Sequence, residues 1–330
     1  MSHWVECQIC PKQCRIAPGR SGDCRIRVNV DGKLVATTYG FPTTMHIDPM
    51  EKKPLYHFLP GSDILSVATV GCNLHCQGCQ NHSISQANPE EMEAWEFPPE
   101  RLVELAIERG SPSIAYTYTE PIASYEYTLD CCSAARSKGI RNVLVTAAYI
   151  NEAPLRKLCP YVDAANVDIK SFSEEFYRKM CSASLAPVLR ATQVMVEMGV
   201  WVEITYLVIP EMNDSPEEIN AMLAWVKQNL GTEIPIHFSR FHPQYRMKNV
   251  PPTPAETMEM CRTTALEMGF PFVYLGNLRR PGGEDTLCPN KECPERTTPL
   301  IARAGFRILS NRLVAGKCPA CGAAVAGVWS

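Results

Sequence analysis

The sequence predicts an α/β protein built on a partial (β/α)6-type barrel, with a cysteine-rich addition at each end. Three observations support this prediction. The middle of the 330-residue chain alternates short apolar runs with segments of helical periodicity, a pattern typical of a parallel sheet. A hydrophobic content of 45% in a chain of this length is enough for one large core of roughly 200–250 residues. Most of the 16 cysteines fall into three groups, and two of these groups lie outside the alternating region.

Six runs rich in β-branched or aromatic residues are expected to form the parallel strands. They cover 63–71, 111–118, 141–148, 162–170, 201–210 and 234–242, and 270–276 is a candidate final strand. Helices are expected at 98–109, 122–138, 152–159, 184–198, 215–229 and 254–268. In barrels of this kind the chemistry lies at the carboxyl ends of the strands, so the residues that follow each strand are the functional candidates.

Composition divides the chain into three regions. We expect a cysteine-rich N-terminal extension over 1–60, the barrel over 61–278, and a linker with a small C-terminal unit over 279–330. The linker is marked by the Gly- and Pro-rich run RRPGGEDT. The segment DPMEKKPLYHF, before the barrel, carries two lysines and His57. We expect it to be a solvated loop, and contact with substrate is the alternative.

Charge and hydropathy argue against several classes of protein. The net charge is −3 and no basic run is concentrated, so neither a nucleic acid nor an anionic membrane is expected as a partner. The first residues lack the charged and apolar regions of a signal peptide. No uncharged apolar stretch reaches the roughly 18 residues of a membrane span. We therefore expect a soluble, cytoplasmic protein whose cysteine spacing points to metal and not to disulfides.

The run GCNLHCQGCQN places Cys72, Cys76 and Cys79 directly after the first predicted barrel strand. Zinc sites and cubane iron–sulfur clusters normally recruit four protein ligands. A cubane held by three thiolates keeps one iron without a protein ligand, and that iron can accept a chelating small molecule. The triplet therefore indicates a catalytic 4Fe–4S site, and a zinc knuckle is the alternative.

This C-x3-C-x2-C motif on the first βα loop resembles the signature of the radical S-adenosylmethionine (radical SAM) superfamily. The resemblance implies that S-adenosylmethionine chelates the open iron and is cleaved by an electron from the cluster to a 5′-deoxyadenosyl radical. From CQICPKQCRIAPGRSGDC to the C-terminal cysteines, the chain is most similar to the radical SAM enzymes of the AmmeMemoRadiSam system. These enzymes are related to pyruvate formate-lyase activating enzymes.

The resemblance also implies which residues bind the cofactor, each in a short motif at a strand end or after the cysteines. They are Asn81 in CQN, Glu120 in YTYTEP, Asp168 and Lys170 in VDIK, and His242 in FSRFH. Glu120 matches the acceptor for the methionyl ammonium, a role suited to a charged carboxylate. The alternative is that these residues are ordinary polar groups at strand ends.

The chain departs from the superfamily pattern at three places. Gly78 stands where many members have an aromatic residue. Tyr118 and Thr119 replace two glycines before Glu120, and Ala147–Ala148 replaces an Asn-Gly pair. The segment LVIPEMND resembles the fifth-strand segment that lies over the adenine.

The C-terminal cysteines are expected to form a zinc-ribbon-like unit. The Cys-x2-Cys-Gly turn directs backbone amides at the sulfurs, and four thiolates close the coordination shell of a structural Zn2+. An auxiliary iron–sulfur cluster is the alternative. The four ligands are Cys288, Cys293, Cys318 and Cys321. A thin apolar layer against the barrel is expected from Phe306, Ile308, Leu309, Leu313, Val314, Val328 and Trp329.

The N-terminal cysteines match no regular zinc finger. Their spacing is C-x2-C-x3-C-x9-C, and both zinc and an accessory 4Fe–4S cluster are open interpretations. The set consists of Cys7, Cys10, Cys14 and Cys24. The five cysteines outside the three groups are expected to be buried small hydrophobes. They are Cys131, Cys132, Cys159, Cys181 and Cys261.

Three functions follow from these motifs. The first is a radical SAM enzyme that abstracts hydrogen from a small-molecule substrate, with an external electron donor of the flavodoxin or ferredoxin type. The second is an activating enzyme that takes hydrogen from a backbone glycine of a glycyl-radical enzyme, so that the substrate is a protein. The third, an iron–sulfur electron carrier or redox scaffold, is disfavoured because a carrier gains nothing from an iron without a protein ligand.

Overall fold

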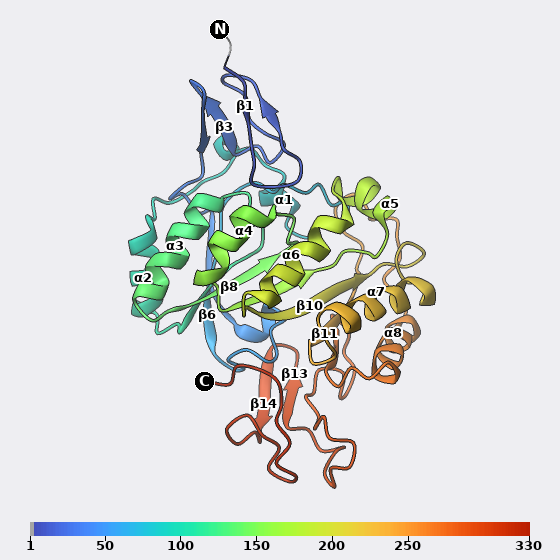
Figure 1. Ribbon diagram of the computed structural model, residues 1–330. Coiled ribbons are helices and arrows are strands. Elements are labelled where there is room, and N and C mark those ends of the chain that lie inside the picture. The colour runs from blue at the N-terminus through green and yellow to red at the C-terminus, as the bar shows by residue number, and fades with distance from the viewer. Residues whose placement is uncertain (1–2) are drawn as a thin grey trace.

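A computed structural model describes residues 3–330, and an eight-stranded sheet forms its centre (Figure 1). The strand order is β12-β11-β10-β9-β8-β7-β6-β5, and all neighbours from β6 to β12 are parallel. The parallel strands are β6 (Asp63–Ala68), β7 (Ser113–Tyr116), β8 (Arg141–Thr146), β9 (Ala164–Asp168), β10 (Trp201–Val208), β11 (Ile236–Arg240) and β12 (Val273–Gly276). Each lies inside a predicted run, and the predicted partial-barrel fold class is confirmed.

Helices connect the parallel strands, as predicted. They are α2 (Pro99–Glu108), α3 (Tyr125–Ser137), α4 (Glu152–Leu158), α6 (Leu185–Glu197), α7 (Pro216–Asn229) and α8 (Ala255–Glu267). Their limits follow local chemistry. For example, the Ser215 hydroxyl accepts a hydrogen bond from the Glu218 amide at 3.2 Å, and Pro216 occupies the first helical position of α7. In α6 the buried Leu185, Val188 and Ala191 recur at helical spacing and pack into the main core.

One strand of the central sheet was not predicted. Strand β5 (Thr44–Pro49) pairs antiparallel with β6 along its whole length, from Thr44 opposite Ala68 to Pro49 opposite Asp63. It belongs to the segment that we assigned to the N-terminal extension. Its polar residues His46 and Asp48 gave it no apolar run for sequence reasoning to detect.

The N-terminal unit contains two small hairpins and lies at one end of the barrel (Figure 1). Cys7, Cys10 and Cys14 lie between the strands of the first hairpin, and Cys24 lies in the segment that joins the two. The hairpins are β1 (Val5–Glu6) with β2 (Arg15–Ile16), and β3 (Arg27–Val30) with β4 (Lys33–Ala36). This N-terminal unit touches the loop that follows β6. A Cβ on Gly71, whose φ is +94°, would lie 2.8 Å from the Cys24 carbonyl oxygen. The close approach explains why glycine precedes Cys72.

The C-terminal unit lies at the opposite end of the barrel, where β13 (Ile301–Ala304) pairs with β14 (Arg307–Asn311) (Figure 1). Arg303 of β13 is buried and donates to the Tyr56 carbonyl and the Thr286 hydroxyl, both at 2.8 Å. The Val328 amide donates to the His57 carbonyl at 2.7 Å. The chain before the barrel therefore forms the surface on which the C-terminal unit docks.

Two expectations for these segments are wrong. DPMEKKPLYHF is not a solvated loop, because Lys53 and His57 are at most 1% exposed. The expected apolar layer is also incomplete. Phe306, Leu309 and Val314 are exposed, whereas Leu313 and Trp329 do pack against a small core cluster that includes Tyr56. The first expectation failed because charged side chains of DPMEKKPLYHF are paired inside the fold. The second failed because the hairpin β13–β14 exposes some of its apolar side chains.

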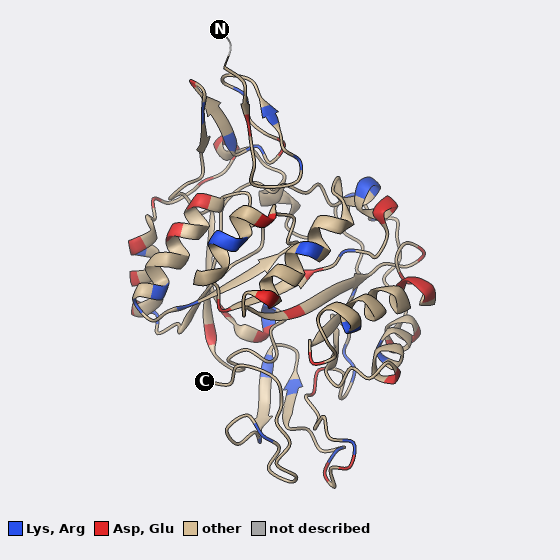
Figure 2. Ribbon diagram, viewed as in Figure 1, with Lys and Arg blue, Asp and Glu red and all other residues tan. Residues whose placement is uncertain are grey.

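Charged residues of both signs are interspersed along the helices (Figure 2). On α4 and α6 they form a cross-helix network, in which Glu152 pairs with Arg156 at 2.7 Å and with Arg190 at 2.9 Å. Within residues 3–330, no helix is long and apolar enough to cross a membrane.

Candidate functional site

The three cysteines of the triplet lie on the loop between β6 and α1 (His82–Ser85), at the carboxyl end of the sheet. The Leu74 amide points at the Cys72 sulfur at 3.3 Å, and the Ser85 hydroxyl lies 3.3 Å from the Cys79 sulfur. Short contacts of this kind neutralise part of the charge on a thiolate. The loop therefore offers one hydrogen-bond donor to each of two of the three sulfurs.

A π-helix braces the same loop. The segment Tyr177–Cys181 accepts two backbone hydrogen bonds from it, from the His75 amide to Cys181 at 2.9 Å and from the Gln77 amide to Met180 at 3.0 Å. Single π-turns are frequent at functional sites. Here the π-turn fixes the backbone on both sides of Cys76.

Sulfur spacing separates this site from a mononuclear metal site. Tetrahedral zinc with bonds of about 2.3 Å holds its sulfurs about 3.8 Å apart. In the described chain, residues 3–330, the triplet is not among the groups of three or more ligand atoms that all lie within 4.8 Å of one another. A cubane fits this wider spacing because each thiolate binds a different iron atom.

Glu120 is a buried carboxylate beside the triplet. It is 3% exposed, and its two oxygens accept hydrogen bonds from the Thr146 hydroxyl at 2.6 Å and the Ala147 amide at 2.8 Å. Among the residues that the structure describes, no lysine, arginine or histidine forms an ion pair with Glu120. Burial raises the pKa of both Glu120 and Cys72, and the Glu120 carboxylate raises the pKa of Cys72 further. A buried carboxylate without a cationic partner fits a cationic ligand group, such as an ammonium.

Asp168 and Lys170 form an ion pair at the end of β9, with 2.5 Å between the Asp168 oxygen and the Lys170 nitrogen. Burial opposes the charge on Lys170, but the Asp168 carboxylate and the Cys76 sulfur hold its pKa above the usual value. Asn213 braces the pair, since its side-chain amide donates to the Lys170 carbonyl at 2.8 Å. Lys170 therefore places a positive charge close to Cys76.

Asn81 and His242 have different surroundings. The Asn81 amide donates to the Tyr118 carbonyl at 2.8 Å, which ties the cysteine loop to the segment that carries Glu120. His242 is exposed after β11, and its ring lies 3.4 Å from the Asn277 carbonyl. The structure thus brings Asn81, Glu120 and Lys170 together around the triplet, and it leaves His242 at the margin.

The space next to Gly78 is filled from elsewhere in the chain. A Cβ at Gly78 would lie 3.0 Å from the Met247 sulfur and 3.4 Å from the Phe241 ring. The segment after β11 therefore packs where a side chain at position 78 would otherwise lie. Its backbone also contacts the loop, through the Arg246 amide and the Gln77 carbonyl at 3.1 Å.

Two contributors to the site were not predicted. Cys181 is buried, as expected, but its carbonyl also accepts from the His75 amide at 2.9 Å, and its thiol is the main influence that lowers the pKa of Cys76. Asn213, in the motif LVIPEMND, is buried. Its side-chain amide donates to the Lys170 carbonyl and its side-chain oxygen accepts from the Ile209 amide. Both contacts join segments far apart in the chain, so spacing gave no signal for them. The motif LVIPEMND was the only pointer to Asn213.

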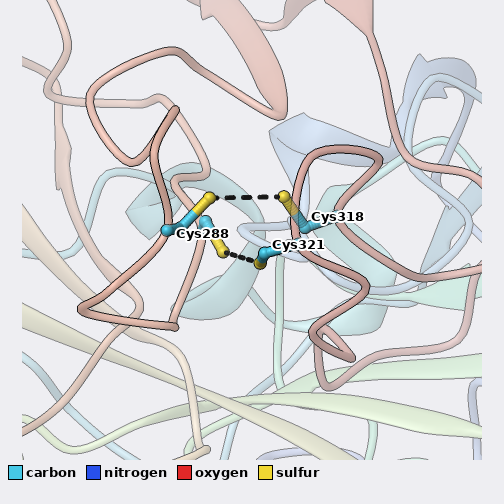
Figure 3. A group of neighbouring side chains, drawn as sticks. Cys288, Cys318 and Cys321 are labelled. Atoms are coloured by element: carbon cyan, nitrogen blue, oxygen red, sulfur yellow. Dashed lines mark hydrogen bonds between the residues drawn. The ribbon is translucent and has the colours of Figure 1, made fainter.

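The four C-terminal cysteines form one compact group, labelled in part in Figure 3. The sulfurs of Cys288 and Cys321 are 3.6 Å apart, and those of Cys293 and Cys318 are 3.8 Å apart. These separations match the value of about 3.8 Å for a tetrahedral ion with four thiolates. The Ala323 amide lowers the pKa of Cys321 to about 7, as expected for a Cys-x2-Cys-Gly turn. The geometry fits a single tetrahedral metal ion.

The N-terminal cysteines are also brought together, but more loosely. Cys7, Cys10 and Cys24 are buried and Cys14 is partly exposed, and all four line one hollow. Within residues 3–330, the sulfurs of the N-terminal cysteines, unlike those of the C-terminal set, do not form a group in which all atoms lie within 4.8 Å of one another.

A partial α/β barrel with a three-cysteine loop after its first parallel strand defines a class of iron–sulfur enzymes, and comparisons with known proteins give the same answer. The family model of the radical SAM superfamily matches residues 66–225. An uncharacterised protein of Methanocaldococcus jannaschii is 44% identical over 96% of this chain and 94% of its own length. The pyruvate formate-lyase-activating enzyme of Clostridium pasteurianum is 20% identical over 54% of this chain and 80% of its own length.

Among solved structures, Streptococcus suis SuiB bound to S-adenosylmethionine has a TM-score of 0.51 and 13% identity, over 69% of this chain and 53% of that chain. This likeness concerns the fold. The chain belongs to the radical SAM superfamily. Membership implies a 4Fe–4S cluster, S-adenosylmethionine, an electron donor and a substrate.

Proposed function

We propose that the chain is a radical SAM enzyme whose Cys72, Cys76 and Cys79 hold the catalytic 4Fe–4S cluster. When bound, the cluster and S-adenosylmethionine supply a 5′-deoxyadenosyl radical, which removes hydrogen from the substrate. The observation that carries the proposal is Glu120. Its buried carboxylate lies beside the three-cysteine loop and has no ion-pair partner among the described residues.

The residues around the triplet have separate roles in this proposal. Glu120 accepts the methionyl ammonium through the lone pairs that its contacts with Thr146 and Ala147 leave free. Lys170, oriented by Asp168, faces an anionic or polar group of the cofactor. Asn81 fixes the distance between the cysteine loop and the Glu120 segment through the Tyr118 carbonyl. His242 contributes at the margin of the site.

We propose a small molecule as the substrate. The N-terminal unit contacts the cysteine loop at Gly71, and it contacts the segment after β8 through the Asn151 amide and the Ile9 carbonyl at 2.9 Å. The N-terminal unit thus covers part of the end of the barrel at which the proposed catalytic residues lie. This cover limits access for a folded protein. An activating enzyme for a glycyl-radical enzyme is the second candidate, favoured by the similarity to the clostridial activating enzyme.

The remaining assignments complete the proposal. The compact C-terminal cysteines hold a structural Zn2+. An external flavodoxin or ferredoxin supplies the electron, and the protein works in the cytoplasm without nucleic acid or membrane partners. Four thiolates on a single ion leave no position for substrate, so the C-terminal metal acts in folding and not in turnover.

The test uses the full chain, reconstituted with iron and sulfide in the absence of oxygen. The wild type should form 5′-deoxyadenosine from S-adenosylmethionine with dithionite, and its reduced EPR signal should change when S-adenosylmethionine is added. Replacing Cys72, Cys76 and Cys79 by alanine should abolish 5′-deoxyadenosine formation, while Cys261→Ser, at a buried position of α8, is the matched control. A triple variant that still forms 5′-deoxyadenosine would disprove the assignment.

A second assay separates the two candidate substrates. Cell extract is divided by size into small molecules and proteins, and each fraction is incubated with the enzyme and deuterated S-adenosylmethionine. Deuterium exchange or substrate-dependent 5′-deoxyadenosine with the small-molecule fraction supports the first candidate. A glycyl radical signal with the protein fraction supports the activating enzyme instead.

A further inference from the structure

The N-terminal cysteines surround a single hollow, although they come from separate segments of the N-terminal unit. The hollow is partly open to solvent. Cys7, Cys10, Cys14 and Cys24 all line it. Four cysteines around one hollow offer a complete set of thiolate ligands, and the catalytic triplet does not use them.

The two four-cysteine sets of this chain differ in how far apart their sulfurs lie. The C-terminal sulfurs lie within 4.8 Å of one another, the separation expected around one ion. Neither the N-terminal set nor the catalytic triplet is gathered in this way within residues 3–330. The N-terminal set therefore resembles the triplet, for which we propose a cubane, and not the compact C-terminal group.

A buried donor beside the hollow lacks an acceptor within residues 3–330. Arg27 is 5% exposed and lines the hollow, and its two terminal nitrogens donate to Glu126 at 2.6 Å each. Its Nε atom is buried and has no hydrogen-bond partner among the described residues. A buried N–H without a partner is costly. Sulfur atoms of iron–sulfur clusters commonly accept such bonds.

We propose that Cys7, Cys10, Cys14 and Cys24 hold a second 4Fe–4S cluster, to which Arg27 Nε donates a hydrogen bond. Four protein ligands leave no iron free, so this cluster binds neither S-adenosylmethionine nor substrate. It lies next to the catalytic loop, because Asn73, the neighbour of Cys72 in the chain, lines the same hollow. The comparison with the triplet rests on the function proposed above, and the experiments below test the two clusters separately.

The decisive variant lacks the catalytic ligands. In the full chain with Cys72, Cys76 and Cys79 replaced by alanine, anaerobic reconstitution should retain about four iron and four sulfide per chain, with about one zinc at the C-terminal cysteines. Adding Cys7→Ser and Cys10→Ser should remove this iron, whereas adding Cys261→Ser should not. Loss of all iron from the triple variant, with about two zinc per chain, would overturn the proposal in favour of an N-terminal zinc site.

The wild type provides a second test that does not depend on a variant folding. It should bind about eight iron per chain, four for each cluster. Mössbauer spectra should show two cubanes, only one of which changes on adding S-adenosylmethionine. About four iron with two zinc per chain would refute the second cluster, even if 5′-deoxyadenosine formation depends on the triplet as proposed.

Discussion

Tyr118 and Ala148 have backbone conformations that glycine adopts most easily, with φ of +64° and +53°. Both stand in or next to positions where the superfamily usually has glycine. Such strain costs on the order of 1–3 kcal/mol and persists where neighbouring contacts offset it. Tyr118 has such contacts, since its hydroxyl donates to Asp48 and its ring lies 4.5 Å from the Lys53 nitrogen. The backbone around Glu120 thus keeps a glycine-like path without glycine.

The charge of Glu120 can be tested directly. Glu120→Gln should weaken S-adenosylmethionine binding about 10–100-fold, because a charge-assisted contact contributes about 1.5–3 kcal/mol. Lys170→Ala should weaken it in the same range. Affinity is measured by equilibrium binding to reconstituted protein, with iron content and thermal unfolding as checks of assembly.

Glu152→Gln is the matched control, because Glu152 is a partly exposed carboxylate on α4 whose partners are surface arginines. Its affinity should equal that of the wild type. If Glu120→Gln and Lys170→Ala also bind with wild-type affinity, these residues are structural and the proposed cofactor site is wrong.

At the scale of elements, the parallel strands were predictable and the docking of the C-terminal unit was not. Strands such as Ala164–Asp168 are buried along most of their length, so they appear in the sequence as apolar runs. DPMEKKPLYHF is rich in charges, and its partners are far away in the chain. Lys53 pairs with Asp48, and Glu203 of β10 accepts the Tyr56 and His57 amides at 2.9 and 2.8 Å. Spacing reveals ligands on one loop, such as the cysteine triplet, but not pairs between distant segments.

A directed chain of hydrogen bonds joins the C-terminal unit to the barrel. Arg303 donates to Thr286, and the Thr286 hydroxyl lies 2.9 Å from that of Tyr274. The Tyr274 hydroxyl lies 2.5 Å from His57 Nε2, and His57 Nδ1 lies 2.6 Å from the Ala326 carbonyl. Because a carbonyl only accepts, His57 donates from Nδ1, and in the neutral ring Nε2 then accepts from the Tyr274 hydroxyl. Burial accordingly lowers the pKa of His57 to about 4.

This histidine predicts acid sensitivity of the docked state. The unfolded chain binds a proton at His57 near pH 6.5, whereas the folded chain binds it only near pH 4. Between these values the unfolded state holds more protons, so stability falls as the pH falls. The loss from pH 7.5 to pH 5 should be about 2 kcal/mol.

The measurement compares wild type and His57→Asn by urea unfolding at both pH values. The variant is less stable overall, but its stability should fall by about 2 kcal/mol less than that of the wild type. Subtracting the loss of stability of the variant from that of the wild type cancels the acid sensitivity of the thiolate sites, because both proteins have these sites. Equal losses in the two proteins would show that His57 does not titrate in this range.

At the scale of the whole molecule, the two cysteine-rich units lie at opposite ends of the barrel (Figure 1). The N-terminal unit contacts the catalytic loop at Gly71 and through a hydrogen bond of 2.9 Å between an Asp23 carboxylate oxygen and His75 Nε2. The C-terminal unit packs near Glu203, close to the amino end of β10. Only the first unit is placed to influence the catalytic cysteines.

This arrangement predicts opposite consequences for the two units. Cys318→Ser with Cys321→Ser should release about one zinc per chain and expose the tail to protease, because metal binding organises a segment too short for a core of its own. The iron content and the affinity for S-adenosylmethionine should not change. Cys7→Ser with Cys10→Ser should instead lower that affinity, because it removes the support next to Gly71 and Asn73. Limited proteolysis, metal analysis and equilibrium binding on the same preparations check both halves. Loss of cofactor affinity in the C-terminal variant, with the N-terminal variant unaffected, would contradict the division of roles between the two ends of the barrel.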